Sequence, residues 1–303
     1  MKSTNYILAS AALMLALGSC SESEEIYIEP VAATVTADIN TAITRASGAT
    51  WANEDAIGIS TATADTKTTY TNKKYVTTDN GQTFSHDGGK ETGIFFKDSK
   101  KVKFSAYYPF SGTEGTSAGT IEIDTRDQSK QGAFDFLYAT SEEEADHDNP
   151  NIKFTFTHKM TKLTLQVKVE KESGFTEEAL ETISYSLGGL KHDGQFNTET
   201  GAVSLKEDAE AAGDWTLANG TTSSSDRGLD IYDMILCPQT NTGLQFKATV
   251  GTESFYCTLT PALAEGTSYT YNITVKKTGL TVSTCDINDW TTGTSGNVNA
   301  EMQ

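Results

Sequence analysis

"NIKFTFTHKMTKLTLQVKVE", residues 151–170, is the stretch that decides the fold of this chain. Apolar and polar side chains alternate along it, which is typical of a β-strand with one buried face. The apolar side chains occupy even positions first and odd positions afterwards: Ile152, Phe154 and Phe156, then Leu163, Leu165, Val167 and Val169. Because a shift of one residue turns the apolar face of a strand over, this stretch cannot serve a single core. We therefore predict two strands, two cores and a domain boundary near residue 158.

The same alternation recurs along most of the chain. KVKFSAYYPF, residues 101–110, places five apolar side chains on one face of a strand: Val102, Phe104, Ala106, Tyr108 and Phe110. LQFKATV, FYCTLTP and YTYNITVKK repeat the pattern, and turn-forming stretches such as VGTES and LAEGTS separate them. Only residues 176–183, TEEALETI, have a helical pattern. The sequence thus predicts an all-β fold of antiparallel β-sandwiches.

The first twenty residues have the pattern of an export signal. Lys2 precedes an apolar run from Ile7 to Leu17, and small residues follow. The ending Leu-Gly-Ser-Cys resembles the lipobox of bacterial lipoproteins, in which the cysteine, here Cys20, carries lipid; the alternative is a plain secretory signal. SESEE, residues 21–25, is either a solvated tether or, by its resemblance to acidic runs in lipoproteins of the Bacteroides group, a surface-export signal.

A further strand precedes the first tryptophan. VAATVTADI, residues 31–39, alternates an apolar face with a polar one, and the apolar face consists of Val31, Ala33, Val35, Ala37 and Ile39. A single cut after Arg45, before Ala46, would detach this strand from the rest of the chain. The small residues after Arg45 favour an exposed loop. The alternative is an ordinary loop arginine that is never cleaved.

Composition and motifs argue against several functions. The chain has 303 residues and a formal net charge of −18, whereas nucleic acids and anionic membranes attract proteins rich in Lys and Arg. Serine-elbow, zinc-helix and phosphate-loop motifs are absent from the sequence. EEEADHDNP, residues 142–150, surrounds His147 with carboxylates but lacks the spacing and the turn glycine of a calcium loop, so we interpret it as a solvated loop. We expect no catalytic residue, no cofactor and no metal.

Histidine and cysteine residues give weak signals. His158 lies in phase with the phenylalanines before it, which favours a packed histidine over a catalytic or metal-binding one. If Cys20 carries lipid, Cys237, Cys257 and Cys285 remain, so at most one pair could form a disulfide. The alternation around Cys257 favours a small packed side chain.

An ordered set of motifs resembles the fimbrillin family of Bacteroidales, in particular its Mfa-like branch. The set comprises the lipobox, ITRASGATWANEDAIGI after an N-terminal strand, FSAYYPF, DFLYATS, FTFTHKMTKLTLQVKV and the closing YTYNITVKKTGLTVSTCDINDW. The resemblance implies two tandem transthyretin-like β-sandwich domains. With it, the chain divides into a signal peptide at 1–20, a tether with a removable first strand at 21–45, domains at 46–158 and 159–290, and a flexible tail at 291–303.

The resemblance also implies a function. Family members are subunits of a surface fimbrium and reach the outer membrane as lipoproteins. A trypsin-like maturation protease cuts after an arginine, which matches Arg45 here, and removes the lipid and the first strand. A strand from another subunit then fills the opened groove. The implied partners are other fimbrial subunits, the outer membrane through Cys20 before processing, the protease, and a receptor on a host or bacterial surface.

Three points stay open in the sequence. The tail TTGTSGNVNAEMQ has few apolar residues, which is atypical of a donor strand, so a tip or anchor subunit competes with a shaft subunit. A surface lipoprotein that binds glycan without polymerising is the alternative function, with aromatic candidates at Trp51, Trp215, Tyr107 and Tyr108. An enzyme with a pair of carboxylates is the third and weakest hypothesis.

Overall fold

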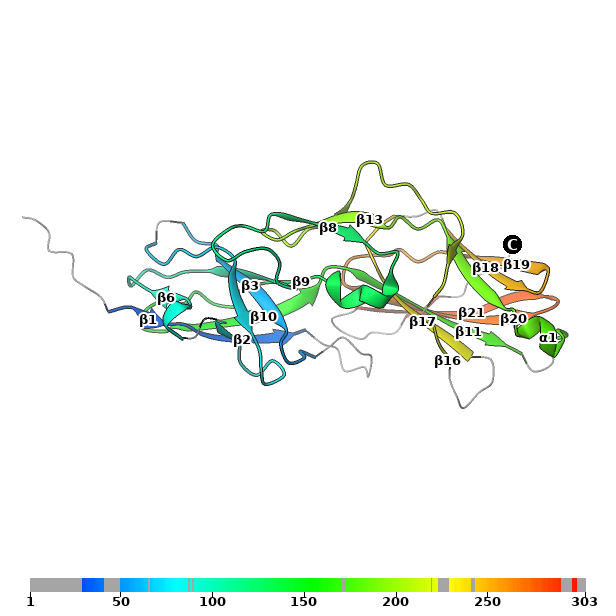
Figure 1. The fold of residues 1–303 in the computed structure, drawn as a ribbon, viewed down its shortest axis with the longest axis horizontal. Helices are drawn as coiled ribbons and strands as arrows, with labels where there is room; N and C mark the ends of the chain where they lie inside the picture. The colour runs from blue at the N-terminus through cyan, green and yellow to red at the C-terminus, as the bar shows by residue number, and fades with distance from the viewer. Residues whose placement is uncertain are drawn as a thin grey trace, which may run out of the picture.

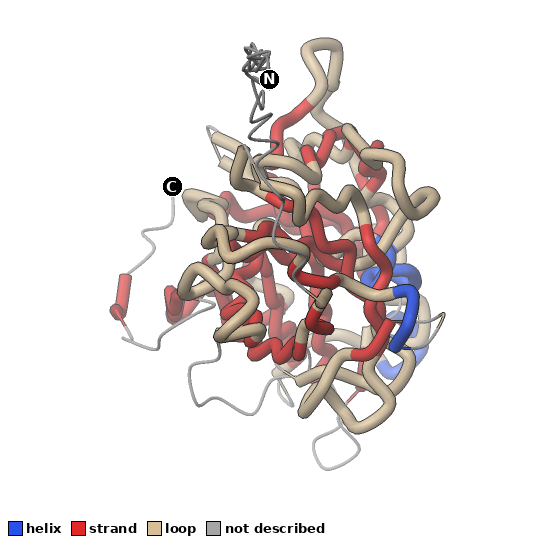
Figure 2. Tube along the Cα trace, turned by 90° about the vertical axis from the view of Figure 1, so that its left-hand side faces the viewer, coloured by secondary structure: helices blue, strands red, loops and turns tan. Residues whose placement is uncertain are grey.

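The computed structural model describes residues 29–40, 50–289 and 296–298, except for gaps at 65, 87, 89, 171–172, 219, 223–228 and 241–242. Within these residues nearly all regular structure is β-strand (Figure 2). The helical elements of the described residues are the single α-helical turn α1 (Glu177–Leu180) and two short 3-10 helices, η1 (Lys90–Thr92) and η2 (Gln128–Ala133). The all-β fold class is confirmed. No helix in the described ranges is long and apolar enough to cross a membrane.

The molecule is elongated, with the N-terminal half, up to residue 158, at one end and the C-terminal half, from residue 159, at the other (Figure 1). The main sheet of the N-terminal half has the strand order β2-β10-β9-β7-β3-β4-β5. Its strands are β2 (Thr34–Ile39), β3 (Ala56–Thr61), β4 (Lys73–Val76), β5 (Ser85–His86), β7 (Phe104–Tyr108), β9 (Leu137–Thr140) and β10 (Asn151–His158). A two-stranded sheet of β1 (Val31–Ala32) and β6 (Phe95–Phe96) lies beside it.

Two further sheets form the C-terminal half. One has the order β16-β17-β11-β20-β21-β22 and the other β15-β12-β18-β19. The strands are β11 (Thr161–Val169), β12 (Ser184–Gly188), β15 (Trp215–Thr216), β16 (Thr221–Thr222), β17 (Leu229–Leu236), β18 (Leu244–Val250), β19 (Glu253–Leu259), β20 (Thr267–Lys276), β21 (Gly279–Asp289) and β22 (Gly296–Val298). Strand β22 belongs to the tail that the sequence predicts to be flexible, yet it pairs with β21.

Two strand pairs are parallel, although the sequence predicts antiparallel sandwiches. β2 runs parallel to β10, and β11 runs parallel to β20. Alternation of side chains reports the buried face of a strand but not its direction, so the sequence pattern contains no signal for this difference. Parallel neighbours cannot be joined by a tight hairpin, and both pairs accordingly join segments that are distant in the sequence.

The ribbon from β10 to β11 contacts three cores in succession. Ile152, Phe154 and Phe156 are buried in the N-terminal core, whereas Leu163 and Leu165 are buried in the C-terminal core. These are the two apolar sets that the phase shift predicts. Between the two sets, Met160 belongs to a third cluster that lies between the halves, with Phe136, Phe196 and Ile235 among its members.

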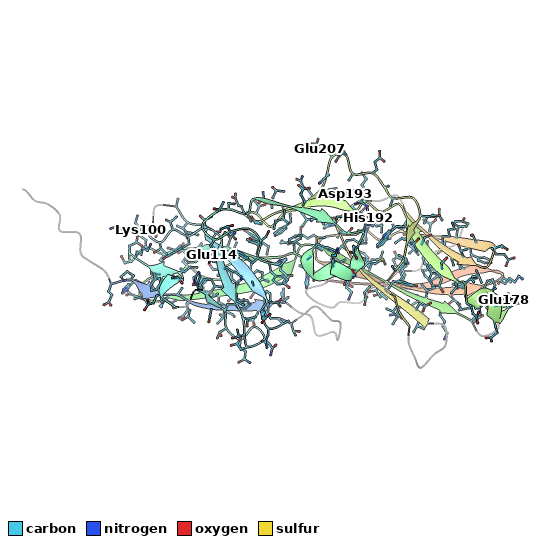
Figure 3. All side chains as sticks on the ribbon, in the orientation of Figure 1. Lys100, Glu114, Glu178, His192, Asp193 and Glu207 are labelled. Atoms are coloured by element: carbon cyan, nitrogen blue, oxygen red, sulfur yellow. The ribbon has the colours of Figure 1, made fainter. Side chains whose placement is uncertain are left out.

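A small sheet joins the two halves. Its order is β14-β13-β8, in which β8 (Thr120–Asp124) comes from the N-terminal half, and β13 (Asp193–Asn197) and β14 (Val203–Leu205) come from the C-terminal half. The guanidinium of Arg126 forms a bidentate ion pair with Asp193, and Lys206 pairs with Glu122. Figure 3 shows His192 and Asp193 in the middle of the molecule. The junction is therefore a hydrogen-bonded sheet with its own apolar cluster.

The stacked pair Phe136 and Phe196 dominates this apolar cluster. The ring centroids lie 4.3 Å apart, and both side chains are buried. Phe196→Ala should lower the free energy of unfolding by about 3–5 kcal/mol, because a large cavity would remain in a close-packed site. Urea unfolding measures this change. Gln195→Ala on the same strand is the matched control and should change it by about 0.5 kcal/mol or less; an equal effect of both substitutions would contradict the prediction.

The junction also contains a buried histidine. His192 is fully buried, its Nδ1 lies 2.9 Å from Thr125 Oγ1, and burial together with the Arg126 charge lowers its pKa from 6.5 to about 4. Because the unfolded chain takes up the proton first, the stabilising contribution of neutral His192 is complete above pH 6.5 and is lost as the pH falls to about 4.

His192→Gln should flatten the fall of the thermal unfolding midpoint across this pH range. His147→Gln is the control, since Asp148 raises the pKa of the His147 side chain, so His147 contributes a slope of the opposite sign. An unchanged pH slope in His192→Gln would show that other groups cause the acid sensitivity. Thermal unfolding monitored by circular dichroism at several pH values provides the measurement.

Candidate functional site

The first strand segment of the described chain, residues 31–39, lies between β10 on one side and residues 84–96 on the other, and we call the space that it occupies the groove. Figure 1 shows β1 at the outer end of this half and β2 running from there toward the middle of the molecule. β2 pairs in parallel with β10 over six positions, from Thr34 opposite Asn151 to Ile39 opposite Phe156. On its other side, the amide of Phe84 donates to the carbonyl of Val35 at 3.1 Å. The strand is thus hydrogen-bonded on both sides.

At the start of the segment, residues 31–34 are also held by backbone hydrogen bonds. β1 pairs with β6, and the amide of Ala33 donates to the carbonyl of Ile94 at 2.8 Å. The amide of Thr34 donates to the carbonyl of Pro150 at 2.9 Å, and His147 Nε2 lies 3.1 Å from the carbonyl oxygen of Glu29. The loop at 142–150 therefore contacts the start of the strand segment.

The side chains of this segment alternate as its sequence indicates. Val35 and Ala37 are buried in the N-terminal core, and Ala33 and Ile39 pack partly against it. Thr34 and Asp38, on the opposite face, are exposed. Only two side chains of the segment are fully buried and one of them is alanine, so the contribution of its side chains to the core is small, whereas its backbone pairing is extensive.

Trp51 covers the inner end of β2. Its Nε1 donates to the carbonyl of Ala37 at 2.8 Å, and its ring makes edge contacts with Phe84, Tyr108 and Phe156 at centroid distances of 5.2–5.4 Å. A Cβ atom at Gly81, which has φ +90°, would lie 2.1 Å from the indole ring, so only glycine fits beside this side chain. Trp51 is a buried packing residue rather than an exposed binding platform.

Both ends of segment 41–49 lie beside one pocket. Ile39 and Thr50 line a pocket of about 360 Å³ between the two halves, together with Asp135, Lys162 and Asp233. The amide of Asn40 still donates to the carbonyl of Phe156 at 2.8 Å. Arg45 and Ala46, the residues of the predicted cleavage, lie outside the described residues, as does Cys20 of the predicted lipidation site.

The structure also describes the surroundings of the histidine, metal-site and cysteine candidates from the sequence. His158 is buried and its Nδ1 lies 3.0 Å from Asp135 Oδ1, which matches the interpretation as a packed histidine. The described residues contain no group of three or more histidine, cysteine or acidic side chains that could hold a metal ion, in the 142–150 loop or elsewhere. Cys237 and Cys257 are free, and burial raises the pKa of both thiols to about 12, so neither is a reactive thiolate near neutral pH.

The four aromatic residues proposed for a glycan platform do not form one. Trp51 and Tyr107 are buried, and the Tyr108 hydroxyl donates to Asp55 Oδ1 at 3.0 Å beside Trp51. Trp215 lies in the C-terminal half, with its ring 4.6 Å from that of His192. The alternation places Tyr107 on the outer face of its strand, and the structure shows that the cluster between the halves covers this face.

These features define a class of structural β-protein in which the first strand lies in the groove and completes the sheet of the N-terminal half. Residues 44–290 match the sequence profile of the fimbrillin-like family, and the chain belongs to this family. Its members are structural proteins of fimbriae and adhesion rather than enzymes. The recognition of the family in the sequence motifs is therefore confirmed.

The chain is similar to known proteins over nearly its whole length. It is 30% identical to a Bacteroides uniformis protein assigned as fimbrium subunit Fim1C, over 98% of both chains. A crystal structure of a protein assigned to cell adhesion from Bacteroides ovatus superimposes with a TM-score of 0.72 at 26% identity, over 87% of this chain and 99% of the other. A second such protein, from Bacteroides uniformis, has a TM-score of 0.67 at 27% identity over 86% and 99%.

Trp51→Phe tests how the first strand is held. The substitution removes the Nε1 donor and leaves the carbonyl of Ala37 without this hydrogen bond, so opening of the strand should become easier by about 1–3 kcal/mol. Hydrogen exchange of the peptide that spans residues 31–39, measured by mass spectrometry on the full chain, should accelerate. Trp215→Phe is the control and should leave this peptide unchanged. Equal protection in wild type and Trp51→Phe would mean that backbone pairing alone holds the strand.

Proposed function

We propose that this chain is a subunit of a surface fimbrium and that it assembles by β-strand complementation. The observation that carries the proposal is the position of residues 31–39, which are hydrogen-bonded on both sides in a groove and continue into the fold only through segment 41–49. Membership of the fimbrillin-like family supports association with other fimbrial subunits and a location at the cell surface. The relatives assigned to fimbriae and cell adhesion support an adhesive role.

Removal of this strand would leave an acceptor site of defined chemistry. The backbone groups of β10 between residues 151 and 156 would lose their partners, as would the amide of Phe84 and the carbonyl of Ile94. The space of Val35 and Ala37 would open to solvent. Unpaired strand edges and apolar grooves are both satisfied by an added strand, and this is the physical basis of β-augmentation.

A covalent cut gives this exchange its direction. Since the present strand buries only two side chains fully, an incoming strand with similar side chains recovers a similar burial of about 1.5–3 kcal/mol for each valine-sized group. Replacement of the first strand by a strand of another subunit is then close to neutral in free energy. Proteolysis after Arg45 makes the first strand a separate peptide that stays with the lipid on Cys20. The mature chain can then leave this peptide, and its vacated groove accepts the strand of another subunit.

The proposed maturation begins with a lipoprotein. Lipid on Cys20 holds the precursor at the outer membrane, and a trypsin-like protease then releases a mature chain that begins at Ala46. Ile39 and Thr50, which lie just before and just after the predicted cleavage segment in the sequence, line the same pocket. The described residues on both sides of Arg45 are thus close together, which supports a cut that leaves their surroundings in place.

An accessory position in the fimbrium, at the tip or as an anchor, fits the C-terminal strands better than a place in the shaft. β21 pairs with β20 over its whole length, and Leu280 and Val282 are buried in the C-terminal core. β22 pairs with the other side of β21. Donation of residues 279–289 to a neighbour would therefore break the existing sheet. The tail after residue 290 has few apolar residues, so it is a poor donor strand in their place.

The decisive experiment determines the mature N-terminus in the native cell. Intact mass and N-terminal sequencing of the surface protein should identify a chain that begins at Ala46. Arg45→Ala should retain the lipid on Cys20 and residues 31–39, and it should be absent from purified fimbriae. Arg227→Ala removes an arginine of the C-terminal half that is not the predicted cleavage residue, so this variant is the control and should mature normally. If wild-type protein keeps its lipid and its first strand, strand complementation is wrong and the chain is a resident surface lipoprotein.

A further inference from the structure

A second concave site lies on the outer face of the N-terminal sheet. The central strands β3, β7 and β9 place Ser60, Ser105 and Thr140 directly beside one another on this face, as cross-strand neighbours. They line a groove of about 360 Å³ on the side of the sheet opposite the core. Ile59 and Ala106, their neighbours in sequence, point into the core. The floor of the groove is thus a row of hydroxyl groups.

Two tyrosines with restrained rings form part of the walls. Tyr70 is half-buried, and its hydroxyl accepts a hydrogen bond from the amide of Phe95 at 3.0 Å. Tyr138 is half-buried, and its hydroxyl donates to the carbonyl of Glu199 at 2.7 Å. Because hydrogen bonds hold both hydroxyl ends, the rings lose little further freedom when a ligand contacts them.

The C-terminal half completes the rim through the turn at residues 198–199. Thr198 Oγ1 donates to the carbonyl of Gly119 at 2.9 Å, and Glu199 accepts a hydrogen bond from Ser117 Oγ at 2.8 Å. Segments from both halves therefore face one groove. The turn at residues 198–199 follows β13, and Figure 1 shows the paired strands β8 and β13 near the middle of the molecule and away from β1.

The backbone beside the floor is fixed before any ligand arrives. Asn72 is buried at a φ of +48°, its Nδ2 donates to the carbonyl of Ser111 at 2.9 Å, and its Oδ1 accepts from the Tyr107 hydroxyl at 2.8 Å. A Cβ atom on Gly58 would lie 2.4 Å from the Tyr107 ring, so this close approach requires glycine. A preformed site of this kind avoids part of the entropy cost of binding.

The chemistry of the lining selects a class of ligand. Hydroxyl groups both donate and accept hydrogen bonds, and aromatic rings offer apolar surface to C–H groups. Glu199 is the one charged residue among the described lining residues, and its carboxylate repels an anionic ligand. Lys97 and Lys159 are not lining residues, but their ammonium nitrogens lie 5.2 and 5.9 Å from the ring centroids of Tyr70 and Tyr138. The volume lies at the lower end of the range of about 300–1,000 Å³ for small-ligand pockets. We propose that this groove binds a neutral saccharide of one or two rings.

This proposal is independent of strand complementation. The groove contains no residue of the first strand or of segment 41–49, and it lies on the opposite face of the sheet from the core that the first strand completes. A subunit that never matures would still contain the groove. Failure of one proposal therefore leaves the other untouched.

Saturation-transfer NMR on the purified full chain tests the proposal with lactose, maltose and diacetylchitobiose as neutral probes and sialyllactose as the anionic counterpart of lactose. At least one neutral probe should bind with a dissociation constant on the order of 1 mM. Sialyllactose should bind more weakly than lactose because of Glu199. Thr140→Arg, which fills the groove from an exposed strand position, should reduce the affinity at least tenfold.

Two variants make the outcome decisive. Glu199→Gln should weaken binding about tenfold through loss of a charge-assisted hydrogen bond, and it carries the test if Thr140→Arg proves unfolded by circular dichroism. Thr258→Arg places the same substitution on exposed β19 in the C-terminal half and should bind as wild type does. Absence of saturation transfer from every neutral probe at about 10 mM, unchanged affinity in the folded groove variants, or tighter binding of sialyllactose would each overturn the proposal.

Discussion

The structure depends on one ribbon, β10 and β11, whose side chains change phase at residues 158–161. Before the change they fill the N-terminal core, at Met160 they enter the cluster between the halves, and after it they fill the C-terminal core. Side chains on a strand alternate strictly, so a ribbon that keeps one phase serves a single core. The change of phase lets one ribbon belong to both halves, and the shared sheet of β8, β13 and β14 adds a second connection between them.

The first strand depends on the same ribbon. β2 finds its partner backbone groups on β10, and its inner end is covered by Trp51, which also contacts Phe156 of β10. The small side chains Ala33 and Ala37 limit what the strand contributes to the core, whereas the paired backbone holds it in register. An element that is held mainly by backbone pairing can be replaced by another strand without a change of the surrounding packing, and this property underlies the proposed mode of assembly.

Much of the fold was predictable, and the failures have physical causes. The alternation identified the buried faces of residues 31–39 and 151–169, because burial on a pleated strand is a local property with period two. It assigned Tyr107 to an outer face correctly, but it could not show that Phe196, 89 residues later in the chain, would cover that face. The hydroxyl row of Ser60, Ser105 and Thr140 was likewise invisible, since no local pattern distinguishes these residues from other outward-facing residues of a sheet.

The sequence by itself determined the all-β class, the alternating faces, the change of phase near residue 158 and the family, because each follows from local periodicity or from ordered motifs. Only the tertiary structure decided which strands pair and that β2 and β10 run parallel. It also decided that Trp51 covers the inner end of β2, and that hydroxyl groups from three strands line one concave face. The physical reason is that strand pairing satisfies backbone groups that are identical at every residue, so partners are selected by the packing of the whole molecule.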